Sequence, residues 1–146
     1  MVLGPMRLSV FVCYEDLLPE FTRDLVHEGR PNVLVNLTND AWYGDTHEPW
    51  IHLALAKFRA IEHHRALVRS TNSGVSAFVD PLGRIVSHTG VFTREELVED
   101  VPLLDRGTVF EVLGERPLGA LAVLALAWSV FRRRQRSSTD EGTSKR

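Results

Sequence analysis

Short apolar blocks separated by polar segments run along the first part of the chain, and they predict strands. Three blocks are rich in β-branched or other apolar residues and are bounded by turn formers, as in strands buried in a sheet. They are Arg7–Val12, Asn32–Leu37 and Ala66–Thr71. Two more runs, Val75–Asp80 and Arg84–His88, flank Pro81-Leu82-Gly83, whose turn chemistry predicts a hairpin. Leu97–Val101 is predicted as a further strand.

Helical spacing of apolar residues predicts two helices between these strands. Asp16–Glu28 has Pro19 in its first turn and Gly29 as its stop. Pro49–His64 carries Ile51, Ala54, Leu55, Phe58 and Ile61 on one side. Thr38–Glu48 is predicted to be the loop before it. The alternation of strands and helices predicts an α/β layered domain over residues 1–115, with helices covering a sheet.

The character of the chain changes at Pro117. Leu118–Phe131 holds about 14 residues without a charge, whereas a spanning helix usually needs ~20. Length alone therefore favours a core or interfacial helix. However, only Ser129 interrupts the run, and an arginine cluster follows directly, as on the cytoplasmic side of a membrane. We predict a membrane helix over residues 116–135 and a disordered tail over residues 136–146.

Composition narrows the function classes. The net charge of −2 and the ordinary hydrophobic fraction suggest no nucleic-acid partner. The single cysteine excludes an internal disulfide and a multi-cysteine zinc site. No spacing of ligand residues indicates a metal, and no motif indicates a cofactor.

That cysteine, Cys13, ends the first predicted strand and is followed by Tyr14 and Glu15. A free cysteine is most often a small buried hydrophobe. However, chemistry in open α/β sheets gathers at the carboxyl ends of strands, and a helix N-terminus favours a thiolate. Cys13 is therefore either core filling or a nucleophile. The histidines that could act as its base, His52, His63 and His64, lie on or beside a predicted helix, where solvated positions are expected.

A second candidate feature is the polar and aromatic loop after the next strand. Asn39, Asp40, Trp42 and Tyr43 follow the strand directly, so they are expected to overhang the same edge of the sheet as Cys13. Large aromatics beside small polar groups suit the capture of an amphipathic ligand. The alternative is a structural loop in which Asn39 and Asp40 make local turns and Trp42 caps the core. Its oxygen ligands do not alternate as a calcium loop requires.

Several stretches in order resemble the C-terminal part of the apolipoprotein N-acyltransferases, a membrane-embedded branch of the nitrilase (carbon–nitrogen hydrolase) superfamily. The stretches are CYED, NDAWYGD, PWIHLALAKFRAIE, RSTNSGVSA and PLGALAVLALAWSVFRRRQR. Cys-Tyr-Glu alone is a weak signal, but the ordered run from Asn36 to Gly74 is specific. The resemblance covers nearly the whole chain. It implies part of an α-β-β-α sandwich followed by one C-terminal membrane helix.

The resemblance also implies a chemistry. The family uses a Glu-Lys-Cys set, of which Cys13 matches the cysteine. Its thioester would carry an acyl group from a phospholipid to the N-terminal amine of a diacylglyceryl lipoprotein. The backbone N–H of Tyr14 would stabilise the oxyanion, Glu15 would hold local geometry, and Trp42 and Tyr43 would border the lipid pocket. No cofactor or metal is implied. The implied location is the bacterial inner membrane, with the domain on the periplasmic side and the tail in the cytoplasm.

The chain lacks two catalytic residues of the family pattern. The family's glutamate and lysine precede the cysteine, whereas the lysines here are Lys57 and Lys145. An N-terminal half would then have to come from another chain or from an upstream extension. Two alternatives stay open: a soluble nitrilase-type amidase, and a non-catalytic membrane-tethered remnant.

Overall fold

The computed structural model describes residues 1–143, with side chains described as far as residue 132 apart from residue 130. The chain forms two compact units, Met1–Gly114 and Glu115–Arg146.

The first unit is built on a mixed sheet of six strands in the order β1-β2-β3-β4-β5-β6. The strands are β1 (Val2–Leu3), β2 (Met6–Val12), β3 (Val33–Asn39), β4 (Ala66–Asn72), β5 (Ala77–Val79) and β6 (Ile85–His88). The central strands β2, β3 and β4 are parallel, while β1, β5 and β6 pair antiparallel with their neighbours. The parallel arrangement brings the carboxyl ends of β2, β3 and β4 to one edge.

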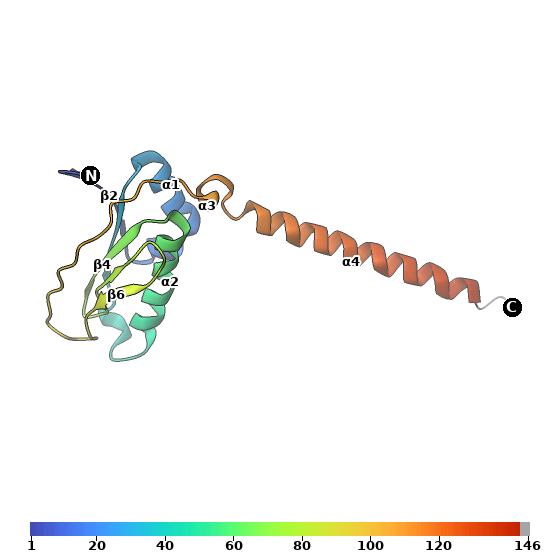
Figure 1. Ribbon diagram of the computed structural model, residues 1–146. Coiled ribbons are helices and arrows are strands. Elements are labelled where there is room, and N and C mark those ends of the chain that lie inside the picture. Colours follow the sequence, from blue (N-terminus) through green and yellow to red (C-terminus); the bar gives the residue numbers. More distant parts are fainter. Residues whose placement is uncertain (144–146) are drawn as a thin grey trace. The chain divides into compact units, whose positions relative to one another are not determined.

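The helices form close to where the sequence predicts them, but the apolar residues that predicted the helix over Pro49–His64 lie on its exposed side: Ile51, Leu55 and Phe58 are 46–49% exposed. The helices are η1, a 3₁₀ helix (Cys13–Leu17), α1 (Pro19–Gly29), η2, a 3₁₀ turn (Ala41–Tyr43), α2 (Glu48–His63) and α3 (Val109–Leu113). Helices α1 and α2 are the crossovers between the parallel strands and cover the same side of the sheet (Figure 1). This confirms the predicted α/β layering.

Two predicted elements differ in the structure. The helix predicted over Asp16–Glu28 is split, because η1 ends at Leu17 and α1 begins at Pro19, where the missing N–H suits a first helical turn. The strand predicted over Leu97–Val101 is wrong. These residues form no strand, and Val98 is 93% exposed, so the run buries too little apolar surface to add to the sheet.

The hydrophobic core lies between the sheet and the two long helices. Phe11, Leu34 and Leu67 point from β2, β3 and β4 toward α1 and α2 and are fully buried. Val26 of α1 and Leu53 of α2 belong to the same cluster. Successive strand residues face opposite sides of a sheet, so the alternate positions form its other face.

That other face keeps exposed apolar side chains. Val10, Val12 and Leu37 are 39%, 56% and 44% exposed, although each lies in a central strand. We call these residues the open face of the sheet. Parallel strands are ordinarily covered on both faces, so this exposure is unusual within the described unit.

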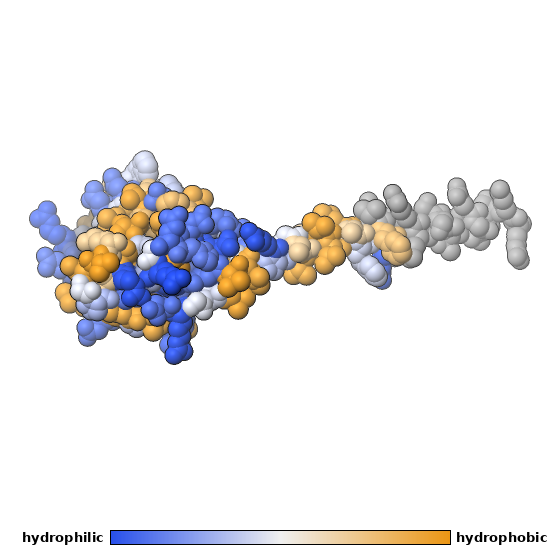
Figure 2. Space-filling model, turned by 90° about the horizontal axis from the view of Figure 1, so that it is seen from above, coloured by the Kyte–Doolittle hydropathy of each residue, from blue (hydrophilic) through white to orange (hydrophobic). Residues whose placement is uncertain are grey.

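The second unit is the helix α4 (Arg116–Thr143). Its described side chains are mainly apolar and exposed, as Figure 2 shows; they include Leu118, Leu121, Leu124 and Trp128. In the described part of the chain, no helix combines the length and the apolar character needed to cross a membrane. The membrane helix predicted over residues 116–135 is thus not found, because the uncharged run is only about 14 residues long and arginines follow it. The helix continues to Thr143, where we predicted a disordered tail, and residues 144–146 lie outside the described residues.

Candidate functional site at the strand ends

Cys13 stands at the carboxyl end of β2 in an unusual backbone conformation. Its φ angle is 53°, in the left-handed region that non-glycine residues rarely adopt. Such a conformation costs of order 1–3 kcal/mol and persists only where the surroundings hold it. The cysteine is free and its side chain is half-buried, so it is not plain core filling.

Hydrogen bonds on both sides hold the turn that carries Cys13. The Asn36 amide, on β3, donates to the carbonyl oxygen of Cys13 at 3.3 Å and to that of Phe11 at 3.4 Å. The carboxylate of Glu15 reaches back and accepts from the Val12 N–H at 2.6 Å. The turn is thereby anchored to the neighbouring strand and closed on itself.

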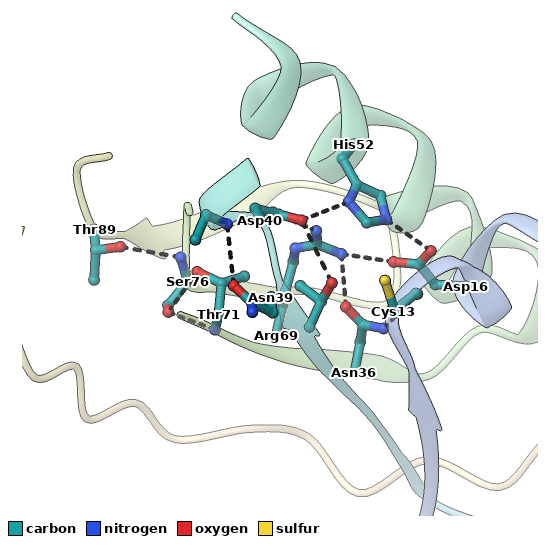
Figure 3. Close-up of polar contacts among 12 residues, drawn as sticks. Cys13, Asp16, Asn36, Asn39, Asp40, His52, Arg69, Thr71, Ser76 and Thr89 are labelled. Carbon is teal, nitrogen blue, oxygen red and sulfur yellow. Dashed lines mark hydrogen bonds and ion pairs between the residues drawn. The ribbon is translucent and has the colours of Figure 1, made fainter. Parts of the chain in front are cut away.

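Four charged side chains meet beneath this turn, and we call them the charge cluster: Asp16, Asp40, His52 and Arg69 (Figure 3). They are only 0–3% exposed. Arg69 donates to Asp16 at 2.6 Å and to Asp40 at 3.1 Å, and also to the Asn36 amide oxygen at 2.6 Å. His52 lies 3.0 Å from a carboxylate oxygen of Asp16 and 3.0 Å from one of Asp40.

The electrostatics of the cluster are set by this pairing. Burial alone lowers the pKa of His52, but the hydrogen bonds to Asp16 and Asp40 outweigh it and raise that pKa to about 9. Burial alone raises the pKa of Asp40, but the His52 hydrogen bond and the Arg69 charge together hold it below its usual value. The imidazolium of His52 and the carboxylate of Asp40 are therefore the forms favoured at neutral pH.

The loop after β3 supplies one member of the cluster and an exposed aromatic. Asp40 is buried with both carboxylate oxygens engaged, so it supports the loop from below. The Asn39 side chain accepts from the Ala41 N–H at 3.1 Å, a local turn. Trp42 is 73% exposed and does not cap the core; its ring meets that of Tyr43 edge-on at 6.4 Å.

The segment after β4 completes the edge. The Thr71 N–H donates to the Ser76 hydroxyl, and the Ser76 N–H donates to the Thr89 hydroxyl, both at 3.0 Å. These bonds close the turn that contains Gly74. A Cβ added at Gly74 would lie 2.5 Å from a carboxylate oxygen of Asp40, so only glycine leaves room for the cluster.

The solvated positions predicted for the histidines are wrong for His52 and His63. We expected solvated positions, but His52 is 3% exposed and His63 is fully buried. Sequence reasoning also missed Asp16, Asn36 and Arg69. A signal existed for the two strand residues, because Asn36 and Arg69 lie two positions after Leu34 and Leu67 and therefore point to the same covered face.

Replacing Gly74 by Ala tests the packing around Asp40. The added methyl group must displace the Asp40 side chain and loosen its contact with Arg69, with at least the ~1–3 kcal/mol cost of an overpacked core. Each kcal/mol corresponds to about 4–8 °C in Tm for a domain of this size. Thermal unfolding followed by circular dichroism measures the shift.

The matched control is Gly107→Ala, whose new Cβ would make only an ordinary 3.6 Å contact. We expect its Tm to stay within a few degrees of the native value. Equal melting of the Gly74→Ala variant and the native chain would contradict the assigned packing.

Two buried histidines predict a stability maximum near pH 6.5. The pKa of His52 is raised to about 9, so its contribution is complete below its unfolded pKa of ~6.5 and is lost as the pH rises through 9. Burial, helped by the charges of Arg65 and Arg59, lowers the pKa of His63 to about 3. Its contribution is complete above pH ~6.5 and is lost as the pH falls.

Urea unfolding from pH 4 to pH 10 measures the free energy of unfolding at each pH. A His52→Gln variant should lose the decline on the alkaline side and keep the decline on the acid side. A variant whose stability still falls with the native slope between pH 7 and pH 9 would show that His52 is not the group that titrates there.

Comparison with known proteins identifies the relationship. Residues 2–109 match the carbon-nitrogen hydrolase family. The chain is 48% identical over 101 residues to apolipoprotein N-acyltransferase 2 of Leptospira interrogans, covering 68% of this chain and 17% of that protein. It is 39% identical over 128 residues to the apolipoprotein N-acyltransferase of Azotobacter vinelandii, covering 88% of this chain and 24% of that protein. The chain thus spans a quarter or less of the length of these relatives.

Solved structures agree on the fold. An amidase from Nesterenkonia sp. is 27% identical with a TM-score of 0.52, over 62% of this chain and 36% of that chain. A carbon-nitrogen hydrolase from Helicobacter pylori has a TM-score of 0.52 at 15% identity, over 60% of this chain and 38% of that chain, and shows the fold alone. The chain therefore belongs to the carbon-nitrogen hydrolase family, and relatives named apolipoprotein N-acyltransferase confirm the resemblance seen in its motifs.

Proposed function

We propose that this chain carries the nucleophile of a nitrilase-type N-acyltransferase that modifies lipoproteins. The observation that carries the proposal is the placement of Cys13, a free, half-buried thiol held at φ 53° at the carboxyl end of a central parallel strand. A strained backbone conformation that surrounding contacts hold in place at the end of a strand is typical of a reacting residue. The relatives at 48% and 39% identity supply the substrate class.

The proposed reaction is covalent catalysis in two halves. The Cys13 thiolate attacks the ester carbonyl of a phospholipid acyl chain, the ester C–O bond breaks, and a lysophospholipid leaves as a thioester forms. The free amine at the N-terminus of a diacylglyceryl lipoprotein then attacks the thioester. The C–S bond breaks, an amide forms, and the thiol is regenerated. The Tyr14 backbone N–H, next to the thiol, is the proposed donor to the oxyanion.

The general base and the cationic oxyanion partner are proposed to come from outside this chain. Lys57 lies on α2 with its backbone carbonyl near Gly83, in the turn between β5 and β6, and Lys145 lies outside the described residues. The upstream glutamate and lysine implied by the family pattern would fill these roles. The open face of the sheet would receive the rest of the α-β-β-α sandwich, which would bury Val10, Val12 and Leu37.

The lipid substrate is proposed to lie against the aromatic loop. Trp42 and Tyr43 follow β3 at the same edge as Cys13; Trp42 is exposed and Tyr43 is half-buried, and aromatic rings with a polar tip suit the boundary between lipid and water. The membrane association of this chain and its periplasmic orientation are part of the same proposal. The relatives named apolipoprotein N-acyltransferase support the membrane association.

A soluble amidase is the second candidate, since the Nesterenkonia amidase shares the fold at 27% identity. Both candidates use the same thiol and differ in the acyl donor. The higher identity to the acyltransferases and the exposed aromatic loop favour the lipid donor. A short-chain amide tested beside a phospholipid on the complemented enzyme separates the two candidates.

Cys13→Ser should abolish acyl transfer in a complemented enzyme. The complement is the part of the Azotobacter vinelandii relative that precedes the matched segment. The base supplied by the complement is matched to a thiol, and a serine hydroxyl is far harder to deprotonate, so no acyl-enzyme should accumulate on serine. Native chain plus complement should acquire a hydroxylamine-sensitive acyl label from a radiolabelled phospholipid. Equal labelling of the serine variant would sink the nucleophile assignment.

The purified chain alone should show no detectable acyl transfer to a diacylglyceryl peptide in phospholipid micelles. Loss of one oxyanion donor costs ~10²–10³ in rate, and loss of a general base costs ~10²–10⁴. These factors need not multiply, because residues that act as a unit are not additive. Either one alone suppresses useful turnover. Robust turnover by residues 1–146 alone would refute the proposal that the general base comes from outside this chain.

A further inference from the structure

Nothing in the proposed reaction uses the charge cluster, although it is the largest group of buried charges at the site. Its members come from four segments: Asp16 from η1, Asp40 from the loop after β3, His52 from α2 and Arg69 from β4. Removing four charges from water is costly, and such a group is not needed for stability alone, since well-packed apolar residues often do as well. We therefore expect the charge cluster to position other parts of the site.

The geometry fixes the protonation of His52. Both ring nitrogens lie 3.0 Å from a carboxylate oxygen, Nε2 from Asp16 and Nδ1 from Asp40. An ionised carboxylate only accepts hydrogen bonds. A neutral imidazole has one unprotonated nitrogen, and the lone pair of that nitrogen would face a lone pair of a carboxylate oxygen. Both nitrogens therefore donate. The other groups that face the ring are Arg69, through the shared carboxylates, and Tyr14, stacked at 5.1 Å between ring centroids. Two cations and two anions leave the cluster neutral.

The cluster touches both functional loops. Toward the nucleophile, Asp16 lies three residues after Cys13, and Arg69 holds the Asn36 amide that binds the Cys13 carbonyl oxygen. Toward the aromatic loop, the Asp40 carbonyl oxygen accepts from the Tyr43 N–H at 3.1 Å and so begins η2. His52 is the one described side chain that bonds Asp16 and Asp40 from the helical side (Figure 3).

We propose that His52, as an imidazolium, is a positioning residue that couples the Cys13 turn to the aromatic loop carrying Trp42 and Tyr43. The His52 ring binds the carboxylates of both Asp16 and Asp40. The distance between the Cys13 thiol and the aromatic loop, which would line the acyl-binding region, is thereby kept fixed. This inference rests on the proposed function only in taking Cys13 as the nucleophile. Reactions of bound groups depend on such placement to within a fraction of an ångström.

The first test uses the native 146-residue chain and needs no variant to fold. Nitrogen-15 NMR of the histidine rings should show both nitrogens of His52 protonated at pH 7. His63, which is buried on the same helix without carboxylates on both sides, is the internal control and should be neutral at that pH. A His52 ring with one unprotonated nitrogen at pH 7 would overturn the proposal.

The second test separates coupling from general destabilisation. His52→Gln keeps the size of the side chain but can donate to only one of the two carboxylates. Ala56→Gly, one turn along the buried side of α2, destabilises the helix without touching the cluster. Iodoacetamide alkylation of Cys13 at pH 7 should become about tenfold faster in His52→Gln, because the turn opens more often. It should stay within about twofold in Ala56→Gly.

Hydrogen exchange reports the coupling directly. Peptides covering residues 12–18 and 39–46 should both take up deuterium faster in His52→Gln. Adding Asp16→Asn should slow alkylation again, because without the imidazolium Asp16 and Asp40 share only the Arg69 cation, and the second substitution restores a neutral cluster. Faster exchange in only one of the two segments, or equal effects in Ala56→Gly, would refute the coupling. No measurement here involves acyl transfer, so the coupling and the acylation of Cys13 can fail independently.

Discussion

The pairing of two cations with two carboxylates beneath the strand ends is the interaction on which the rest of the site depends. Each charge of Asp16, Asp40, His52 and Arg69 is buried, and each has two opposite charges within 3.1 Å. Removing one member would leave the buried cluster with an unbalanced charge, and breaking a buried ion pair in this way typically costs ~3–5 kcal/mol. Because each member belongs to a different segment, their pairing aligns η1, α2, β4 and the loop after β3 at once.

The strained backbone at Cys13 follows from that alignment. A residue at φ 53° would relax if the surrounding contacts allowed it. Asn36 holds the Cys13 carbonyl oxygen, and Asn36 is itself held by Arg69. The same cation thus holds both the cluster and the turn, and the thiol of Cys13 stays half-buried at the carboxyl end of β2. Gly74 belongs to the same framework, since its missing side chain makes room for Asp40.

The sheet itself presents two contrasting faces. One side is sealed by α1 and α2 over Phe11, Leu34 and Leu67, while the open face leaves Val10, Val12 and Leu37 accessible. Central parallel strands are ordinarily covered on both faces, and an exposed apolar surface on them is typical of a site of interaction. The chain matches a quarter or less of its curated relatives, so the remainder of such a protein would supply both the cover and the missing catalytic groups under the proposed function.

The sequence by itself determined the elements that depend on local pattern. The runs at Arg7–Val12 and Ala66–Thr71, the helical spacing after Pro49 and the turn at Pro81-Leu82-Gly83 all appear as strands, helix and hairpin in the structure. Local order also placed Cys13 and the aromatic loop at successive strand ends. These features need only short-range information, because they follow from the period of side chains and from turn chemistry.

Only the tertiary structure decided where the charges go. Asp16 and Arg69 are 53 residues apart in the chain, and Asp16 and His52 are 36 apart, so no local pattern links them. The sequence pattern alone predicts that a histidine on a helix is solvated. The fold shows that η1 and the loop after β3 supply its carboxylates, and that β4 supplies the guanidinium bound to both. The strand predicted at Leu97–Val101 failed for the same reason, since a strand exists only where a neighbouring edge pairs with it. Whether a charge is buried and whether a strand forms both depend on residues that are distant in the sequence and become neighbours only in the fold.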